Sequence, residues 1–262
     1  MDQNEYYNRV EDILQNPPYE ASNKNPLNKF ISSVSSSIKE CKNLISNFQK
    51  RALTVSNPIL PRMYCLPKIH KEGKQMRPII PCINSPASLL SKWLVNEFQK
   101  LEFPSTFSVK DRYQFIDFTK NIILEPDEIL VSFDVVSLYP NVPMKESKEI
   151  IENWLNSLHL NQDIVKEFMI LFNLCISQNS FQFKDNIYNQ LEGTPMGNPL
   201  SCFIANIFMS EFETKAKQVM HYFPRVWLRY DMFAVFDKNQ NIIDFVNELN
   251  SYYPTIKFTF EF

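Results

Sequence analysis

A short run of apolar, branched and aromatic residues, Ile129 to Phe133, ends directly in an acid, Asp134. Such a run is typical of a buried strand. A carboxylate at the end of a core strand has to be solvated, paired or bound to a cation, because an unpaired buried charge is too costly. Two interpretations follow. Asp134 either caps the next turn or belongs to a metal site, since acids with special environments gather at functional sites.

Glycine is scarce, and two of the three glycines in the chain, Gly193 and Gly197, lie in the single segment EGTPMGNPLS at 192–201. This concentration predicts a loop that needs positive φ angles or a close approach of its backbone to something else. Asn198 and Pro199 then form a good N-cap and first-turn pair for a helix. The loop could support a nucleotide or a template base at the helix N-terminus, or be a plain tight turn. It lacks the GxxxxGK[ST] pattern, which argues against a P-loop NTPase.

Two short extended runs, 62–69 and 76–80, flank the polar tip KEGK at 71–74 and predict a hairpin with Gly73 in its turn. Prolines in both runs suit edge strands. The hairpin carries four basic residues, Lys68, Lys71, Lys74 and Arg77. They could clamp a triphosphate, with arginine as a fork and lysine as a point charge, or they could form a charged edge that prevents aggregation.

Apolar periodicity predicts helices over 26–53, 86–103, 112–123 and 162–177, after Pro143, after Pro199, and over 241–250. Residues 1–23 are acidic and poorly patterned, and we expect a loose tail with one short helix. A hairpin is expected around Asp185-Asn186. The last part of the chain contains a strand-like run, 226–236, with Asp231 at its middle, and the alternating strand TIKFTFEF.

Charge is unevenly distributed. Residues 24–122 carry sixteen Lys and Arg against six acids, whereas residues 123–262 carry ten against eighteen. A basic segment beside an acidic one suits a phosphate-binding surface next to a metal centre, although a lysine-rich solvated helix face would give the same balance. The five scattered cysteines suggest free thiols and no zinc site. Without a signal-like start or an apolar run of about 20 residues, we expect an intracellular protein outside the membrane.

Taken together, these segments resemble the reverse transcriptase of the Penelope-like retroelement family over about residues 58–262. The segment LPKIHKEGKQMRPII is similar to the fingers hairpin of that family, and SFDVVSLYPNVP to its first catalytic motif. GTPMGNPLSCFIANIFMSEFE resembles the motif that contacts template and primer, and RYDMFAVF stands where the second carboxylate motif belongs. Four such motifs in the expected order are far more specific than any one of them.

The resemblance implies an α+β fold, namely the fingers and palm of a right-hand polymerase with an antiparallel palm sheet and packed helices. The thumb is expected to be absent, as a departure from the family, because the sequence stops just after the palm. We expect an N-terminal tail and helix at 1–55 and a fingers region with the basic hairpin at 56–128. The palm, with the catalytic strands and incomplete at its C-terminus, is expected at 129–262. The implied activity is RNA-directed DNA polymerisation by a retrotransposon enzyme, a nucleotidyltransferase, on an RNA template and a DNA primer with deoxynucleoside triphosphates. The same resemblance implies a nuclear location.

The resemblance also assigns roles to single residues. Asp134 and Asp231 match the catalytic acids, which with the Val135 carbonyl would bind two Mg²⁺ ions, or Mn²⁺ as the alternative. Tyr139 matches the residue under the sugar that obstructs a 2′-hydroxyl. The remaining nucleotide contacts are implied at Lys68, Arg77, Met196 and Gly197.

The sequence departs from the family at the second carboxylate motif. Where Tyr-x-Asp-Asp is usual, the chain reads Arg229-Tyr230-Asp231-Met232, with one acid in place of two. Removing two residues preserves the alternation of a strand, so a hairpin with a cramped turn can still form. Losing one metal-binding acid lowers transition-state stabilisation. The alternative function is therefore a catalytically inactive remnant that still binds nucleic acid.

Overall fold

The computed structural model describes residues 2–68, 75–230 and 232–262. The chain divides into two compact units, and each is built from two separate stretches of sequence. Unit 1 comprises residues 1–103 and 143–204, and unit 2 comprises residues 104–142 and 205–262. Helix α9 (Pro199–Val219) begins in unit 1 and ends in unit 2. Helices and antiparallel strands occur in both units, as expected for an α+β chain.

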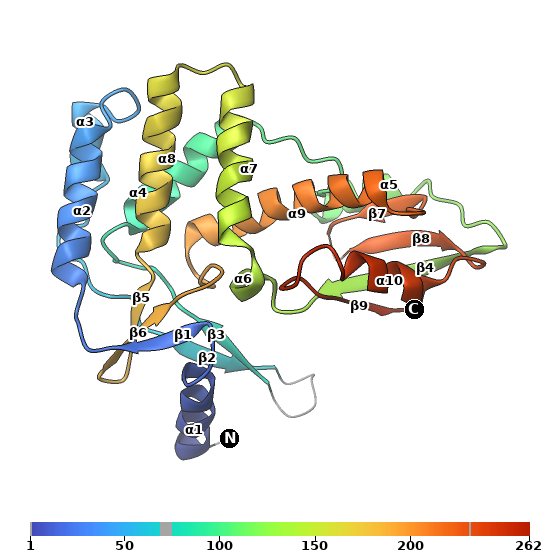
Figure 1. Cartoon of the computed structure of the whole chain (residues 1–262), viewed down its shortest axis with the longest axis horizontal. Coiled ribbons are helices and arrows are strands. Elements are labelled where there is room, and N and C mark those ends of the chain that lie inside the picture. Colours follow the sequence, from blue (N-terminus) through green and yellow to red (C-terminus); the bar gives the residue numbers. More distant parts are fainter. Residues whose placement is uncertain (1, 69–74, 231) are drawn as a thin grey trace. The chain divides into compact units, whose positions relative to one another are not determined.

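The helical part of unit 1 is centred on α8 (Gln162–Ser177), which contacts α2 (Leu27–Glu40), α4 (Ser88–Lys100) and α7 (Met144–Ser157; Figure 1). The fully buried ring of Phe98 on α4 lies at the middle of this layer. It stacks on Phe168 and on Phe203, with ring centroids 5.2 and 4.8 Å apart. Aromatic pairs of this kind add to the apolar area that the helices bury, so they hold the layer together.

The single helix predicted over 26–53 is wrong in its middle, where the chain forms α2 and a separate short helix, α3 (Asn47–Ala52). The carboxylate of Glu167, on α8, accepts hydrogen bonds from the backbone N–H groups of Lys42 (3.0 Å), Asn43 (3.0 Å) and Leu44 (2.8 Å). These donors would otherwise continue the helix. A carboxylate that is distant in sequence therefore ends α2.

The strands of unit 1 form a three-stranded sheet and a separate ribbon. The sheet has the order β1 (Tyr19–Ser22), β6 (Asn186–Gln190), β5 (Ser180–Phe183), and the ribbon pairs β2 (Tyr64–Pro67) with β3 (Met76–Ile79). Both predicted hairpins, β2–β3 and β5–β6, are confirmed. The tip residues Lys71, Gly73 and Lys74 lie outside the described residues.

Residues 1–23, expected to be a loose tail with one short helix, do contain a helix, α1 (Gln3–Leu14), but they are not a loose tail, because strand β1 follows and the helix is packed. Val10 and Leu14 are buried in one apolar cluster with Cys65 and Phe181. The hydroxyl of Tyr6 accepts a hydrogen bond from the Cys65 N–H (2.8 Å). The sequence pattern missed this because the partners of the helix come from remote strands.

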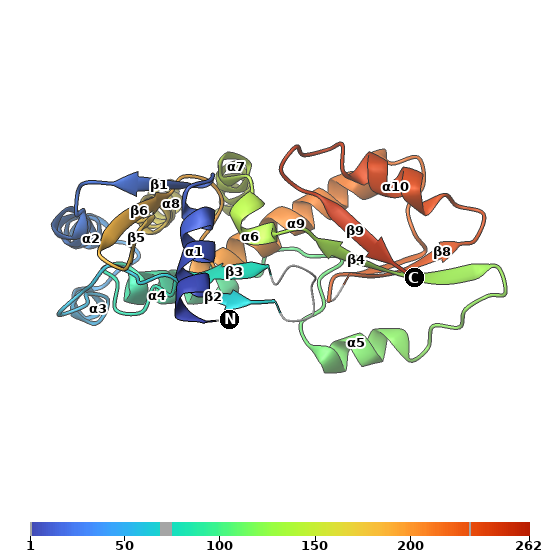
Figure 2. The same cartoon turned by 90° about the horizontal axis from the view of Figure 1, so that it is seen from below.

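Unit 2 is a four-stranded antiparallel sheet in the order β7 (Val226–Leu228), β8 (Phe233–Asp237), β4 (Glu128–Val135), β9 (Phe258–Glu261). Helix α10 (Ile242–Leu249) covers one face through Phe245, whose ring meets those of Phe236 and Phe133. Helix α5 (Arg112–Thr119) lies on the other side of the sheet (Figure 2). There the ring of Phe115 meets that of Phe233.

Strand β4 alternates along its length, because Val131 and Phe133 are buried whereas Leu130, Ser132 and Asp134 are exposed. Successive side chains of a strand point to opposite faces. The exposed set therefore lies on the face opposite α10, which we call the open face because these residues stay exposed although α5 contacts Phe233 on the same side. Within the described part of the chain, no helix combines the length and apolar character needed to cross a membrane.

Candidate functional site

The basic ribbon of unit 1 carries two of the predicted nucleotide contacts. Arg77 pairs with Leu66 in the β2–β3 register, and the Lys68 N–H donates to the carbonyl of Gln75 (2.7 Å), which continues that register by one step. Lys68 and Arg77 are therefore diagonal neighbours on the same face, with Cα atoms about 7–8 Å apart as is usual for such pairs. Arg77 is exposed and Lys68 is half-buried. Two cations at this spacing suit a polyphosphate.

The glycine loop lies against the continuation of the same ribbon. The Ile80 N–H donates to the Met196 carbonyl (2.7 Å), and the Cys82 N–H to the Gly197 carbonyl (3.3 Å). Gly197 has φ +119°, and a Cβ atom on it would lie 2.7 Å from the Ile80 carbonyl oxygen. The positive φ angle and the lack of space for a Cβ atom both require glycine here, which confirms the predicted close backbone approach.

The predicted start of α9 is also confirmed. The side chain of Asn198 accepts a hydrogen bond from the Leu200 N–H (3.0 Å), and the Ser201 hydroxyl donates to the Pro195 carbonyl (2.6 Å). Unit 1 thus brings these predicted contacts together. Lys68 and Arg77 lie on the β2–β3 ribbon, and Met196 and Gly197 bond to the residues that follow β3.

In unit 2, Asp134 lies on the open face at the end of β4, opposite Thr259 of β9 in the register. Val135 is the last residue of the strand. Glu261 pairs with Ser132 and is exposed, so it lies diagonal to Asp134 on the same face. Sequence reasoning did not single out Glu261, although the alternation of TIKFTFEF places it on the polar side of the final strand.

A tight turn follows β4. Ser137 is in the left-handed conformation with φ +49°, and the Asn141 side chain donates to the Val136 carbonyl (3.2 Å). Tyr139 lies on the short helix α6 (Leu138–Asn141) and is half-buried. Tyr139 and Asp134 thus belong to the same unit, separated by this ordered turn.

The run 226–236, expected to be strand-like, forms the β7–β8 hairpin, in which Leu228 pairs with Phe233. The connection is residues 229–232, and Asp231 lies outside the described residues, so its metal and catalytic roles stay predictions. Met232 has φ +44°, a conformation that a side chain such as methionine rarely adopts. Its carbonyl accepts a hydrogen bond from the Phe133 N–H of β4 (3.0 Å). The cramped turn that the shortened motif predicts is consistent with this strain.

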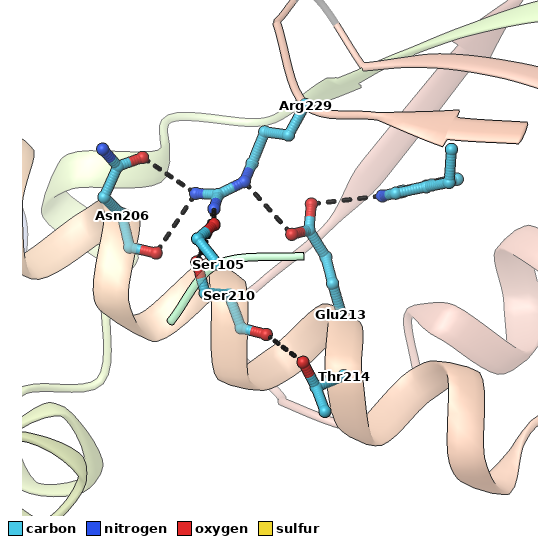
Figure 3. A network of polar contacts seen from close by, with 7 residues as sticks. Ser105, Asn206, Ser210, Glu213, Thr214 and Arg229 are labelled. Atoms are coloured by element: carbon cyan, nitrogen blue, oxygen red, sulfur yellow. Dashed lines mark hydrogen bonds and ion pairs between the residues drawn. The ribbon is translucent and has the colours of Figure 1, made fainter. Parts of the chain in front are cut away.

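Arg229, the first residue of that connection, lies in a polar network on α9 (Figure 3). Its Nη1 donates to the side-chain oxygen of Asn206 (2.9 Å), and its Nη2 to the hydroxyl of Ser210 (2.6 Å). Its Nε lies 3.1 Å from Oε2 of Glu213. Glu213 is 1% exposed and also accepts from the Trp227 indole N–H (3.1 Å).

This network was not predicted from the sequence. Asn206, Ser210 and Glu213 follow one another at intervals of four and three residues, which places them on one side of a helix. Polar residues at that spacing in an otherwise apolar helix were the available signal.

Burial dominates the electrostatics of the pair. Loss of solvent raises the pKa of Glu213 to about 7, although the guanidinium of Arg229 opposes the shift. The same burial lowers the pKa of Arg229. The Arg229 Nε and Glu213 Oε2 face each other without the alignment of a hydrogen bond, so their attraction is mainly Coulombic.

A divalent ion needs several oxygen ligands. Within residues 2–68, 75–230 and 232–262, no group of three or more His, Cys, Asp or Glu side chains is placed to hold one. Asp134 is an exposed carboxylate on the open face, and it alone among the predicted acids is described. The described residues therefore do not complete a two-metal centre, and no step through a metal ion follows from them.

Residues 69–258 match the profile of a protein family described as "Reverse transcriptase (RNA-dependent DNA polymerase)". Among solved structures, the chain is similar to apo telomerase from Candida tropicalis truncated from its C-terminal domain. The TM-score is 0.54 at 14% identity, over 82% of this chain and 54% of that one. Telomerase from Candida albicans in complex with a TWJ fragment of telomeric RNA gives a TM-score of 0.51 at 13% identity, over 93% of this chain and 48% of that one.

The chain thus spans about half the length of the telomerase chains it matches. At these identities the likeness concerns the fold, and it confirms the predicted mixed fingers and palm architecture with antiparallel sheets. A search of curated protein sequences gave no significant match.

Proposed function

This chain belongs to the reverse transcriptase family, and from that premise we propose that it is the fingers and palm of an RNA-directed DNA polymerase of the Penelope-like type. One observation carries the proposal. The family match, residues 69–258, covers most of the hairpin segment and the whole of the other three motif segments. The first catalytic motif, SFDVVSLYPNVP, contains Asp134, which is exposed on the open face near the end of the inner strand β4. An exposed acid at the end of a strand suits contact with a nucleotide better than a role as a buried structural cap.

The proposed partners are an RNA template, a DNA primer and deoxynucleoside triphosphates. The family description names RNA-dependent DNA polymerisation, and one structural neighbour was solved with a fragment of telomeric RNA, which supports an RNA partner here. The basic ribbon with Lys68 and Arg77 suits the triphosphate. Met196 and Gly197 are proposed to support the nascent base pair, and Tyr139 the sugar.

Mg²⁺, or Mn²⁺ as the alternative, is the ion that we propose for Asp134, the Val135 carbonyl and Asp231. Such an ion, when bound, supplies positive charge where the reacting oxygens become negative. Because the second motif has one acid in place of two, we expect polymerisation to be slow.

Primer extension tests the proposal. Purified protein with Mg²⁺, a DNA-primed RNA template and deoxynucleotides should lengthen the primer. Asp134→Ala should reduce the rate by about a thousandfold, since several kcal/mol of charge stabilisation are lost. Asp117→Ala removes an exposed acid of α5 that pairs with Lys120 at the surface, and it should leave the rate unchanged.

A second variant separates a weak enzyme from an inactive one. Inserting Val-Asp between Tyr230 and Asp231 restores the usual motif length and should raise the rate. If neither protein extends a primer, and both bind primed RNA in a salt-sensitive manner that Lys68→Ala and Arg77→Ala weaken, the polymerase proposal fails and the non-catalytic alternative replaces it.

A further inference from the structure

The connection between β7 and β8 is fastened at both of its described ends, and each end uses a different kind of contact. At the C-terminal end of the connection, the Met232 carbonyl accepts a hydrogen bond from the Phe133 N–H of β4 (3.0 Å). At its start, Arg229 is held by its backbone as well as by its side chain. The Arg229 N–H donates to the Phe107 carbonyl (2.7 Å), and the Val109 N–H donates to the Arg229 carbonyl (3.3 Å).

The guanidinium adds a second set of contacts that reaches a different element. Nη1 donates to both oxygens of Asn206, and Nη2 to the hydroxyls of Ser210 and Ser105. Nε faces the carboxylate of Glu213, whose other oxygen is occupied by Trp227. The guanidinium is planar, and its N–H donors point in fixed directions. Only one orientation of the group satisfies all these partners, so the network fixes the direction of the Arg229 side chain as well as attracting it.

We propose that Arg229, oriented by Glu213, is a positioning residue that sets where the β7–β8 connection begins relative to β4. By sequence this connection carries the acid of the second carboxylate motif, so the inference rests on the proposed function. A buried ion pair is a poor source of stability compared with apolar packing. Its value here is geometric. It fixes the register of a four-residue connection that contains no glycine and has a left-handed methionine.

Hydrogen exchange tests the inference without requiring activity. In Arg229→Ala, the Phe133 and Val109 amides, which bond to the connection, should exchange about tenfold faster, because the opening is local. The Lys238 amide, which bonds to Asp127 at the far end of the hairpin, should keep its wild-type rate. Arg229→Lys keeps a charge opposite Glu213 but lacks the fork, and it should show a smaller increase at the same two amides.

Arg225→Ala is the matched control. Arg225 directly precedes β7, the strand that Arg229 follows, but it pairs with Glu128 and has 49% of its side chain exposed. It should leave the Phe133 amide unchanged. If Arg229→Ala accelerates exchange of the Phe133, Val109 and Lys238 amides equally, Arg229 only stabilises the unit as a whole. If exchange of none of the three becomes faster, Arg229 does not hold the connection. Either result overturns the inference. If Arg229→Ala does not fold, Arg229→Lys and Ser210→Ala decide by the same comparison.

Activity gives a second readout. If the wild-type protein extends primers, Arg229→Lys should lower kcat about tenfold and leave the KM for deoxynucleotide within about twofold, because a misplaced group costs rate rather than binding. A change confined to KM would contradict positioning. If the wild-type protein does not extend primers, the proposed function fails, and the exchange experiment still decides whether Arg229 positions the connection.

Discussion

Two connections in this molecule carry motif residues, and they are held in different ways. The glycine loop, residues 192–198 of unit 1, has left-handed glycines at 193 and 197 and hydrogen-bonds its backbone to Ile80 and Cys82. The hairpin connection, residues 229–232 of unit 2, has no glycine. It places Met232 at φ +44° and is fastened by the side chain of Arg229.

The difference shows how backbone strain is accommodated in each place. Glycine removes the steric cost of positive φ, so backbone hydrogen bonds are enough to shape the first loop. Without glycine, a left-handed residue costs about 1–2 kcal/mol, and other contacts have to offset it. Besides its backbone hydrogen bonds to Phe107, Val109 and Phe133, the hairpin connection has two side-chain supports. These are the buried network of Glu213 and Arg229 and the stacking of Tyr230 on Phe115.

The largest effect is expected from Gly197→Ala. The new Cβ would lie 2.7 Å from the Ile80 oxygen and 2.8 Å from the Pro81 Cα, both in the backbone, at a φ of +119°. Strain and overlap together should lower the free energy of unfolding by about 4 kcal/mol, measured by urea denaturation. Gly193→Ala is the control, because φ +65° is accessible to alanine at a cost of about 1 kcal/mol. Equal losses in the two variants would break the account of the glycine loop.

The second largest effect is expected in the pH dependence of stability, through Glu213, which faces Arg229 of the hairpin connection. Burial raises the pKa of Glu213 from 4.5 to about 7. Folded protein therefore binds an extra proton between these values, and stability falls by up to about 1.4 kcal/mol for each pH unit as pH rises through the window. The contribution is complete below about pH 4.5 and lost above about pH 7.

Glu213→Gln removes this titration and keeps an acceptor for the Trp227 indole. The stability of the variant relative to wild type should increase from pH 4.5 to pH 7 and stay constant above it, measured by urea denaturation at each pH. A relative stability that decreases across this window would show that the attraction of Arg229 outweighs burial.

The smallest effect is expected for Tyr230 and Phe115, whose rings stack with centroids 5.5 Å apart. A double-mutant cycle with Tyr230→Ala and Phe115→Ala should give a coupling of about 1 kcal/mol, as is typical of aromatic pairs. Met196→Ala in the glycine loop should cost less stability than Tyr230→Ala, because Met196 bonds to Ile80 through its backbone carbonyl, which alanine keeps. A coupling near zero would leave Arg229 and the Met232 carbonyl as the supports of the hairpin connection.

The sequence alone determined the features that depend on neighbours along the chain. Apolar periodicity located helices α4, α8 and α10 to within a few residues, and alternation with turn residues located both hairpins of unit 1. The Asn198 cap and the close approach at Gly197 followed from local chemistry. Lys68 and Arg77 reach the same face because a hairpin register links them directly.

Tertiary structure decided the features whose partners are remote in sequence. Glu167 ends α2 from more than a hundred residues away, α1 becomes ordered on distant strands, and β9 lies beside β4 so that Glu261 comes diagonal to Asp134. Whether a glutamate such as Glu213 is solvated or buried beside an arginine is likewise invisible in a local pattern. The physical reason is that burial and charge pairing depend on which surfaces meet, and a one-dimensional pattern records only which surfaces are available.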